Sequence, residues 1–515
     1  LNMSGKGKIG IIIALIIIAV AVFMLSGSNQ SKTASGAKDE LIIGQNTDIS
    51  TLDICEGMGS STATACLNIF DTLTRSGSDG KIEPWLAESF EAKNNNTWQF
   101  KLRKGVEFTN GEPFNAEAVK YSFERQVDPK HSFSLAGDYA NIERVEIVDE
   151  YTVNFKTKEP FPMLPIWLTY LGMIPPKYAE EVGPEEFGKK PVGTGPYVFS
   201  EWVKDSHLTL TANEKYFKGK PPFAKLTFKI IPEESTRIAA LQNGEIDLAV
   251  LVPPSQIDQI NKSDGVSIVS GPTTRPIYLG MNLLHEGPLA DVRIRKAICY
   301  ALDVPSIIHN VLLDNGKQIA AFSLPVWAGF DSTIEPYKQD KEKTKELLAQ
   351  AGYTNGKGLS FKLDVVDGEY PAIKEVAQAI AGQLSEAGIE TSVVTMDKNT
   401  FRSKLKDKSI DSLYITGFGG MTSCNPNIAA LVLSAGQRYC CYNDQVMTDL
   451  INKGSTEMDD AQFNKIWRDI QHKIIDDAPI ASLYQLYGIY GISDKIKWTP
   501  RFDEAILAFD IKPTK

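Results

Sequence analysis

The sequence reads Trp98-Gln99-Phe100-Lys101-Leu102-Arg103-Lys104-Gly105-Val106-Glu107-Phe108 and then, after Thr109, Asn110-Gly111-Glu112-Pro113-Phe114-Asn115-Ala116-Glu117-Ala118-Val119-Lys120-Tyr121-Ser122-Phe123. Apolar residues alternate with polar ones at Trp98, Phe100 and Leu102, which predicts a half-buried strand over 97–102. Asn110-Gly111 is a turn signal. The spacing over 116–126 predicts an amphipathic helix. The stretch therefore predicts a strand, a turn and a helix in succession.

Strands and helices are expected to alternate on both sides of this stretch. Strands are predicted at 41–44, 145–148, 151–155, 208–211, 226–231, 246–252, 360–366, 390–395 and 412–416. Helices are predicted at 61–71, 234–243, 292–302, 341–351, 373–387, 400–405 and 460–476. No repeat and no long linker divides this region, so its domains must be discontinuous or tightly packed. The predicted fold class is α/β.

Composition excludes several classes of protein. The chain has 515 residues, enough for two to four domains of about 150 residues. Hydrophobic residues make up 43% and charged residues 23%, which excludes general disorder. Lys plus Arg total 54 against 64 Asp plus Glu, so the net charge is −10 and nucleic acid is not expected as a partner.

The first residues predict export from the cytoplasm. Lys6 and Lys8 precede an uncharged apolar run from Ile9 to Leu25. Such a run is typical of a signal peptide or a membrane anchor, with basic residues kept on the cytoplasmic side. We expect residues 1–25 to be that signal peptide or anchor and residues 26–38, rich in Ser, Gly and Lys, to be a flexible linker. Ser28 stands where a bacterial lipoprotein would carry its lipidated cysteine.

Cysteines outside the cytoplasm tend to pair. Cys424 lies close in sequence to Cys440 and Cys441, so we expect a disulfide from Cys424 to one of these two. A bridge between Cys55 and Cys66 is an open alternative to two free thiols.

Motifs of enzymes and cofactor sites are missing from the sequence. There is no HExxH, no paired CxxC and no GxSxG. Gly193-Thr194-Gly195-Pro196 lacks the third glycine of a dinucleotide loop, and Pro196 has no amide hydrogen for a phosphate, so these residues are read as a backbone corner. We therefore expect no catalytic residues, no cofactor, no dedicated metal site and no enzyme activity.

Ordered motifs over about residues 40–510 resemble one known family. They include Thr51-Leu52-Asp53, Asn68-Ile69-Phe70-Asp71-Thr72-Leu73, Pro84-Trp85-Leu86-Ala87-Glu88-Ser89-Phe90, the stretch from Trp98 to Phe123, Val192-Gly193-Thr194-Gly195-Pro196-Tyr197, Asn213-Glu214-Lys215-Tyr216-Phe217, Asp291-Val292-Arg293-Ile294-Arg295-Lys296-Ala297 and Leu347-Leu348-Ala349-Gln350-Ala351-Gly352-Tyr353. These residues resemble the extracytoplasmic solute-binding proteins, family 5, which serve peptide and nickel ABC importers.

The resemblance implies a two-lobed fold of the periplasmic-binding-protein type, class II. Lobe I would comprise 39–75, 194–276 and 493–515, with an inserted subdomain at 76–193, and lobe II would comprise 277–492. Two crossings near 276 and 492 would form a hinge that closes on a solute.

The resemblance also implies location and partners. We expect a monomer at the extracytoplasmic face of the cell membrane, at the cell surface or in the periplasm. It would be anchored by its N-terminal helix or released by signal cleavage. Its partners would be a small solute, with a peptide favoured, and the permease subunits of an ABC importer with their ATPases. The alternatives are a receptor of the same fold for a nickel or haem chelate, and an extracellular hydrolase.

Two residues by which relatives hold dipeptides are replaced here. In peptide binders of the family, a loop after a lobe II strand carries an Asp for the ligand's ammonium group; here the loop starts Gly417-Phe418, and Met421 stands at the Asp position. Where dipeptide binders place an Arg for the carboxylate, this chain has Asp367, Glu369 and Tyr370. An acidic residue there would repel a carboxylate. Two ligands therefore remain open: a longer peptide held by its backbone, and a cationic solute or metal chelate.

The candidate ligand-binding residues come from these loops and from the expected hinge. Arg275 precedes the hinge strand and is expected to meet an anionic group or to form an ion pair between the lobes. Trp327 and Phe418 are expected to form aromatic walls, or else to pack in the core. The full set comprises Cys55, Glu56, Arg275, Trp327, Glu369, Tyr370, Phe418, Gly419, Gly420 and Met421.

Overall fold

The computed structural model describes residues 39–56, 59–77, 80–133, 135–327, 329–419 and 428–514. The segments predicted as signal or anchor (1–25) and linker (26–38) lie outside the described residues. Among the helices that are described, none combines the length and hydrophobicity needed to cross a membrane.

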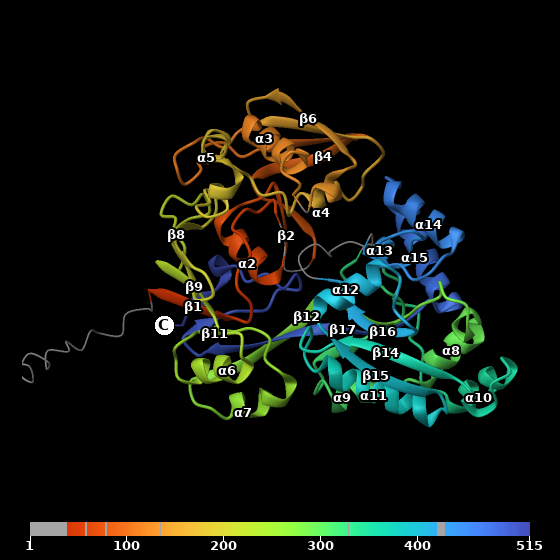
Figure 1. Cartoon of the computed structure of the whole chain (residues 1–515). Helices are drawn as coiled ribbons and strands as arrows, with labels where there is room; N and C mark the ends of the chain where they lie inside the picture. The colour runs from red at the N-terminus through yellow and green to blue at the C-terminus, as the bar shows by residue number, and fades with distance from the viewer. Residues whose placement is uncertain are drawn as a thin grey trace, which may run out of the picture. The chain divides into compact units, whose positions relative to one another are not determined.

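An eleven-stranded mixed sheet runs through the body in the order β15-β14-β16-β12-β17-β11-β1-β10-β9-β8, with β13 paired to β17 (Figure 1). Its strands are β1 (Glu40–Gln45), β8 (Tyr197–Val203), β9 (His207–Ala212), β10 (Lys225–Ile230), β11 (Leu248–Ala249), β12 (Val266–Met281), β13 (Gly316–Gln318), β14 (Ser360–Val366), β15 (Glu390–Met396), β16 (Leu413–Gly417) and β17 (Ile480–Ser493).

Two long antiparallel strands, β12 and β17, join the two ends of this sheet. The first half of β12 pairs with the second half of β17, and the second half of β12 pairs with the first half of β17. The register shifts between Pro272 and Pro276. Beyond this pair, β16 is bonded to β12, and β11 is bonded to β17. The sheet thus has two ends that are connected through one ladder.

Helices cover the strands of the β14–β16 end. Figure 1 shows α11 beside β14 and β15, and α12 above β16. Ile373, Val376, Ile380 and Leu384 project from α11 into the apolar core of this part. The helices are α8 (Val292–Ala301), α9 (Val304–Asn310), α10 (Lys341–Gln350), α11 (Ile373–Glu386), α12 (Lys398–Lys406), α13 (Ile428–Leu433), α14 (Gln445–Thr456) and α15 (Asp460–Asp477).

The β1–β8 end carries α2 (Ser60–Ile69), α6 (Glu234–Gln242) and α7 (Ile257–Asn261). A separate antiparallel sheet, ordered β4-β5-β7-β6, holds the strand predicted at 97–102. In it, Phe100 and Phe155 pack edge to face at 5.3 Å, and Phe123 of α3 lies on Phe155. The elements of this region are β4 (Ala87–Asn94), β5 (Thr97–Leu102), α3 (Ala116–Val127), β6 (Ile142–Asp149), β7 (Thr152–Thr157), α4 (Leu164–Trp167) and α5 (Pro176–Phe187). Two small sheets pair β2 (Thr74–Ser76) with β3 (Ile82–Pro84) and β18 (Ile496–Lys497) with β19 (Lys512–Pro513).

A buried ion pair links the segment after β1 to α3. The Arg125 guanidinium donates to both carboxylate oxygens of Asp53, and the two side chains are only 3% and 1% exposed. Arg125 also lies over the rings of Phe133 and Phe187. Burial by itself would lower the pKa of Arg125, but the hydrogen bonds and charge of Asp53 outweigh it, so the pKa is raised. The Arg125 guanidinium therefore stays charged inside the protein.

The cysteines that are described are thiols. Cys55 and Cys66 are both buried and free, so the bridge considered for them is not formed. Burial raises the pKa of each thiol, which disfavours the thiolate that disulfide formation needs. Cys440 and Cys441 are also free and buried; Cys424 lies outside the described residues, so its pairing stays a prediction.

Candidate functional site

A cavity of about 400 Å³ lies between residues of the two ends of the large sheet. This volume is within the range of small-molecule sites, roughly 300–1,000 Å³. It is lined by Gln45, Asn46, Thr47, Gly59, Ser60, Ser61, Thr64, Val250, Leu251, Arg275, Glu369, Tyr370, Pro371, Lys398, Phe401, Arg402, Leu405, Thr416, Gly417, Phe418, Gly419, Tyr439, Leu486, Tyr490, Glu504 and Ile506.

The N-terminus of α2 forms a polar part of the wall. Gly59 is the N-cap residue, and no side chain caps the helix there. The first turn holds no acidic residue, and the Ser61 hydroxyl is 2.8 Å from that of Thr47. The sequence Gly59-Ser60-Ser61 therefore places small residues and open backbone N–H groups at this wall.

Arg275 lies in the cavity wall, where it contacts Glu504 and Tyr370. Its Nε and Nη2 each lie 3.0 Å from a carboxylate oxygen of Glu504. Its guanidinium lies 5.3 Å from the centre of the Tyr370 ring, and the Tyr370 hydroxyl donates to the Gly417 carbonyl at 2.8 Å. Burial would lower the pKa of Arg275, but the charge of Glu504 outweighs it and the pKa is raised. Arg275 thus forms an ion pair, but its partner Glu504 belongs to the same expected lobe, so this is not the pair between the lobes that the sequence suggested.

The two carboxylates of the loop before α11 both have lysine partners. Glu369 lies 3.1 Å from Lys398 Nζ, and its side chain is 12% exposed. Asp367 lies 3.3 Å from Lys374 Nζ on the exposed surface. The local negative charge on which a cation site would depend is therefore balanced.

Aromatic side chains form the wall next to the end of β16. Phe418 packs against Tyr439 with ring centres 4.7 Å apart. Gly419 passes so close to β12 that a Cβ there would lie 2.5 Å from the Arg275 Cα, and a Cβ on Gly417 would lie 3.1 Å from the Pro276 carbonyl oxygen. The Gly417-Phe418-Gly419 sequence thus lets this loop lie directly on the long strand β12.

The predicted site residues fall into three groups. Arg275, Glu369, Tyr370, Phe418 and Gly419 line the cavity. Cys55 and Trp327 are buried in apolar clusters and Glu56 is on the surface, so these three lie outside its lining. Trp327 packs on Phe322 at 6.0 Å, which is the core role considered for it. Gly420 and Met421 lie outside the described residues.

Sequence reasoning missed several lining residues, among them Gln45, Ser60, Arg402, Tyr439 and Glu504. The missing N-cap side chain before α2 was a signal that could have been noticed. Arg402 and Glu504 carry no local signal, since only the tertiary fold brings them to the cavity. Among the described residues, no group of three or more His, Cys, Asp or Glu side chains is placed to hold a metal ion.

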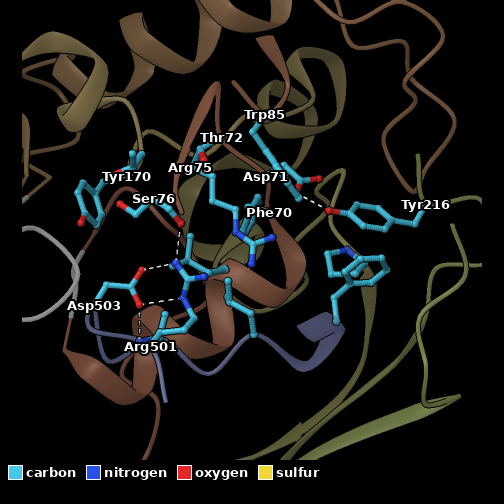
Figure 2. A pocket seen from close by; sticks show the side chains of 16 residues that line it. Phe70, Asp71, Thr72, Arg75, Ser76, Trp85, Tyr170, Tyr216, Arg501 and Asp503 are labelled. Atoms are coloured by element: carbon cyan, nitrogen blue, oxygen red, sulfur yellow. Dashed lines mark hydrogen bonds and ion pairs between the residues drawn. The ribbon is translucent and has the colours of Figure 1, made fainter. Parts of the chain in front are cut away.

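A second cavity, of about 50 Å³, lies beside α2 and has room for little more than water (Figure 2). Asp71 accepts hydrogen bonds there from Trp85 Nε1, Thr194 Oγ1 and the Tyr216 hydroxyl at 2.7–2.9 Å. On the other side of the cavity Arg501 pairs with Asp503 and donates to the Ser76 carbonyl. Asp71 and Arg501 thus have their hydrogen-bond partners within the protein, so we assign the residues around this cavity a role in stabilising the fold.

We expect the stabilising effect of Asp71 to weaken as pH rises. Burial raises the pKa of Asp71 against the three donors, which favour its ionised form. Between the pKa of an unfolded Asp, about 3.9, and the higher pKa of the folded protein, Asp71 is protonated in the folded state and ionised in the unfolded state. Stability from this group is full below the unfolded pKa and is lost as pH rises through the folded pKa. The advantage of the native protein over D71N should thus shrink with rising pH, as read from urea midpoints at several pH values. A difference that grows with pH would contradict this, and D264N, at an exposed position, is the control.

Comparison with known proteins places the chain among binding proteins. The family described as "Bacterial extracellular solute-binding proteins, family 5 Middle" matches residues 81–439. Heme-binding protein A of Haemophilus influenzae is 28% identical over 448 residues, 81% of each chain. The glutathione-binding protein GsiB of Pectobacterium atrosepticum is 28% identical over 459 residues, covering 86% of this chain and 88% of that protein. The ABC transporter substrate-binding protein CtaP of Listeria monocytogenes superimposes with a TM-score of 0.85 at 24% identity, over 93% of this chain and all of that one.

Proposed function

The chain belongs to family 5 of the bacterial extracellular solute-binding proteins, and on this premise we propose that it captures a peptide or similar small solute in the cavity of about 400 Å³. Proteins of this family are the receptors of ABC importers, and they have the two-lobed mixed α/β fold. The observation that supports the proposal is that residues from both ends of the large sheet line one cavity, while β12 and β17 connect the two ends.

The proposed lobes follow the limits expected from the sequence. Lobe I would comprise 39–75, 194–276 and 493–515 with the inserted subdomain 76–193, and lobe II would comprise 277–492. Closure would be a rigid-body rotation about β12 and β17 that encloses the solute. The Arg275–Glu504 ion pair, with the Tyr370 ring packed on the guanidinium, would form a rigid part of the cavity wall against which the solute is enclosed.

A peptide is the leading ligand because the cavity combines polar walls with the aromatic pair Phe418 and Tyr439. The relatives named for haem and glutathione binding support an organic solute of this size. A haem or nickel chelate is the second candidate, and the same relative named for haem favours it. Binding and delivery, without turnover, is the proposed activity.

The proposed setting is the extracytoplasmic face of the cell membrane, at the cell surface or in the periplasm. Residues 1–25 would anchor the protein there or be cleaved as a signal peptide. We propose that the receptor is a monomer that delivers its solute to the permease subunits of an ABC importer, whose ATPases drive uptake.

Native mass spectrometry of the purified chain, before and after mild denaturation, tests the ligand class. We expect released masses that are sums of amino-acid residues, together with a smaller radius of gyration in solution scattering when solute is bound. A single haem mass or a nickel isotope pattern would replace the peptide with a chelate. Turnover of a bound peptide would contradict the receptor function.

A further inference from the structure

Five charged side chains line the cavity: Arg275, Glu369, Lys398, Arg402 and Glu504. Four of them are paired, Arg275 with Glu504 and Lys398 with Glu369. Arg402, on α12, has no ion-pair partner among the described residues. The paired charges cancel, so the cavity keeps one positive charge although the chain as a whole carries −10.

The N-terminus of α2 adds a second positive element to the same cavity. The first hydrogen bond of the helix is donated by the Ala63 N–H to the Gly59 carbonyl at 2.9 Å. In the part of the chain that the structure describes, the N–H groups of Ser60 and Ser61 have no acceptor. Open N–H groups and the helix dipole together favour an anion at this end of a helix.

Gln45 provides an independent sign that a ligand belongs in this cavity. Gln45 is one of the residues that line the cavity and is only 2% exposed, yet its side-chain Oε1 has no hydrogen-bond partner among the described residues. A buried amide oxygen left without a donor costs free energy. A ligand N–H or O–H would satisfy it.

We propose that the cavity selects a solute with an anionic group, held between the N-terminus of α2 and Arg402, and with an N–H or O–H that donates to Gln45. This inference rests on the proposed function and specifies its substrate class. Carboxylates and phosphates share the required chemistry. The cationic solute considered from the sequence is disfavoured, because Glu369 is already neutralised by Lys398.

Three tripeptides with amidated C-termini, which differ only in the charge of the central side chain, test this: Ala-Glu-Ala, Ala-Gln-Ala and Ala-Lys-Ala. We expect calorimetric titration of the full chain at low salt to show about tenfold tighter binding of the acidic peptide than of the amide, which is the effect of about 1.4 kcal/mol. A phosphoserine peptide that binds tighter still would identify phosphate as the preferred anion.

Two variants probe the two positive elements. R402Q removes the unpaired cation, and S60D places a carboxylate at the α2 N-terminus, where it suits the helix and so preserves the fold. Each should remove most of the preference for Ala-Glu-Ala. R468Q, at an exposed position on α15 outside the cavity lining, is the matched control and should keep it.

Equal or tighter binding of Ala-Lys-Ala, or a preference that survives in both variants, would overturn the inference. If no peptide binds while the protein still closes around its co-purified solute, the mass of that solute decides: a solute without an anionic group would overturn the inference and leave the receptor function standing. Loss of solute-dependent closure altogether would instead contradict the proposed function.

Discussion

Replacing Asp53 with alanine is expected to destabilise the protein by about 3–5 kcal/mol, because it leaves the Arg125 guanidinium charged and buried without its partner. Both side chains are almost completely enclosed, and the guanidinium lies over the rings of Phe133 and Phe187. The loss should appear as a lower urea midpoint, with the slope of the transition unchanged.

Two further variants separate the buried charge from a general effect of truncation. D53A combined with R125M should recover part of the lost stability, because the unpaired charge is then gone. E185A, which removes a fully exposed partner of Lys189, should leave the urea midpoint almost unchanged. A small effect of D53A, similar to that of E185A, would contradict the prediction.

Replacing Ser60 with tryptophan should weaken binding of the co-purified solute by about a hundredfold or more, which is at least about 2.7 kcal/mol. Ser60 is exposed at the N-terminus of α2 and lines the cavity, so the large ring would occupy solute space without displacing the core. Calorimetric titration of the solute into the stripped protein measures the loss. The melting temperature should stay within a few degrees of the native value. S255W, at an exposed position outside the cavity, should bind normally, and normal binding by S60W would place the solute elsewhere.

The local elements were predictable where one face of an element is solvated. The strand at 97–102, the strands at 145–148 and 151–155 and the helix from Ala116 all follow from polar and apolar alternation, although the two strands turn at Glu150-Tyr151 and the second begins at Thr152. The corner at Gly193 and Gly195 was also correctly read, since a Cβ on Gly193 would lie 2.2 Å from the Ile69 carbonyl oxygen. Strand β17 was missed because it is buried on both faces for most of its length, so its sequence does not alternate.

The site was predictable only in part, for a different reason. Phe418, Gly419 and Tyr370 were located by resemblance to the loops of the family, and they line the cavity. Gln45, Arg402 and Glu504 come from three segments far apart in the sequence, and nothing local distinguishes them from ordinary surface residues. An ion pair also changes what a residue can bind. From the sequence Glu369 was open as a ligand of a cation, but in the structure Lys398 lies beside it and balances its charge.

The ladder between β12 and β17 has a consequence for how such receptors diversify. The connection between the two ends of the sheet is made by main-chain hydrogen bonds, which tolerate many side chains, whereas most residues that line the cavity, among them those of α2, α12 and the loop after β16, lie outside these two strands. In the proposed closure about β12 and β17, substitutions of these lining residues would change selectivity without altering the axis of movement. The main-chain connection between the two ends of the sheet could then be inherited unchanged while the residues around the cavity, and with them the solute, change.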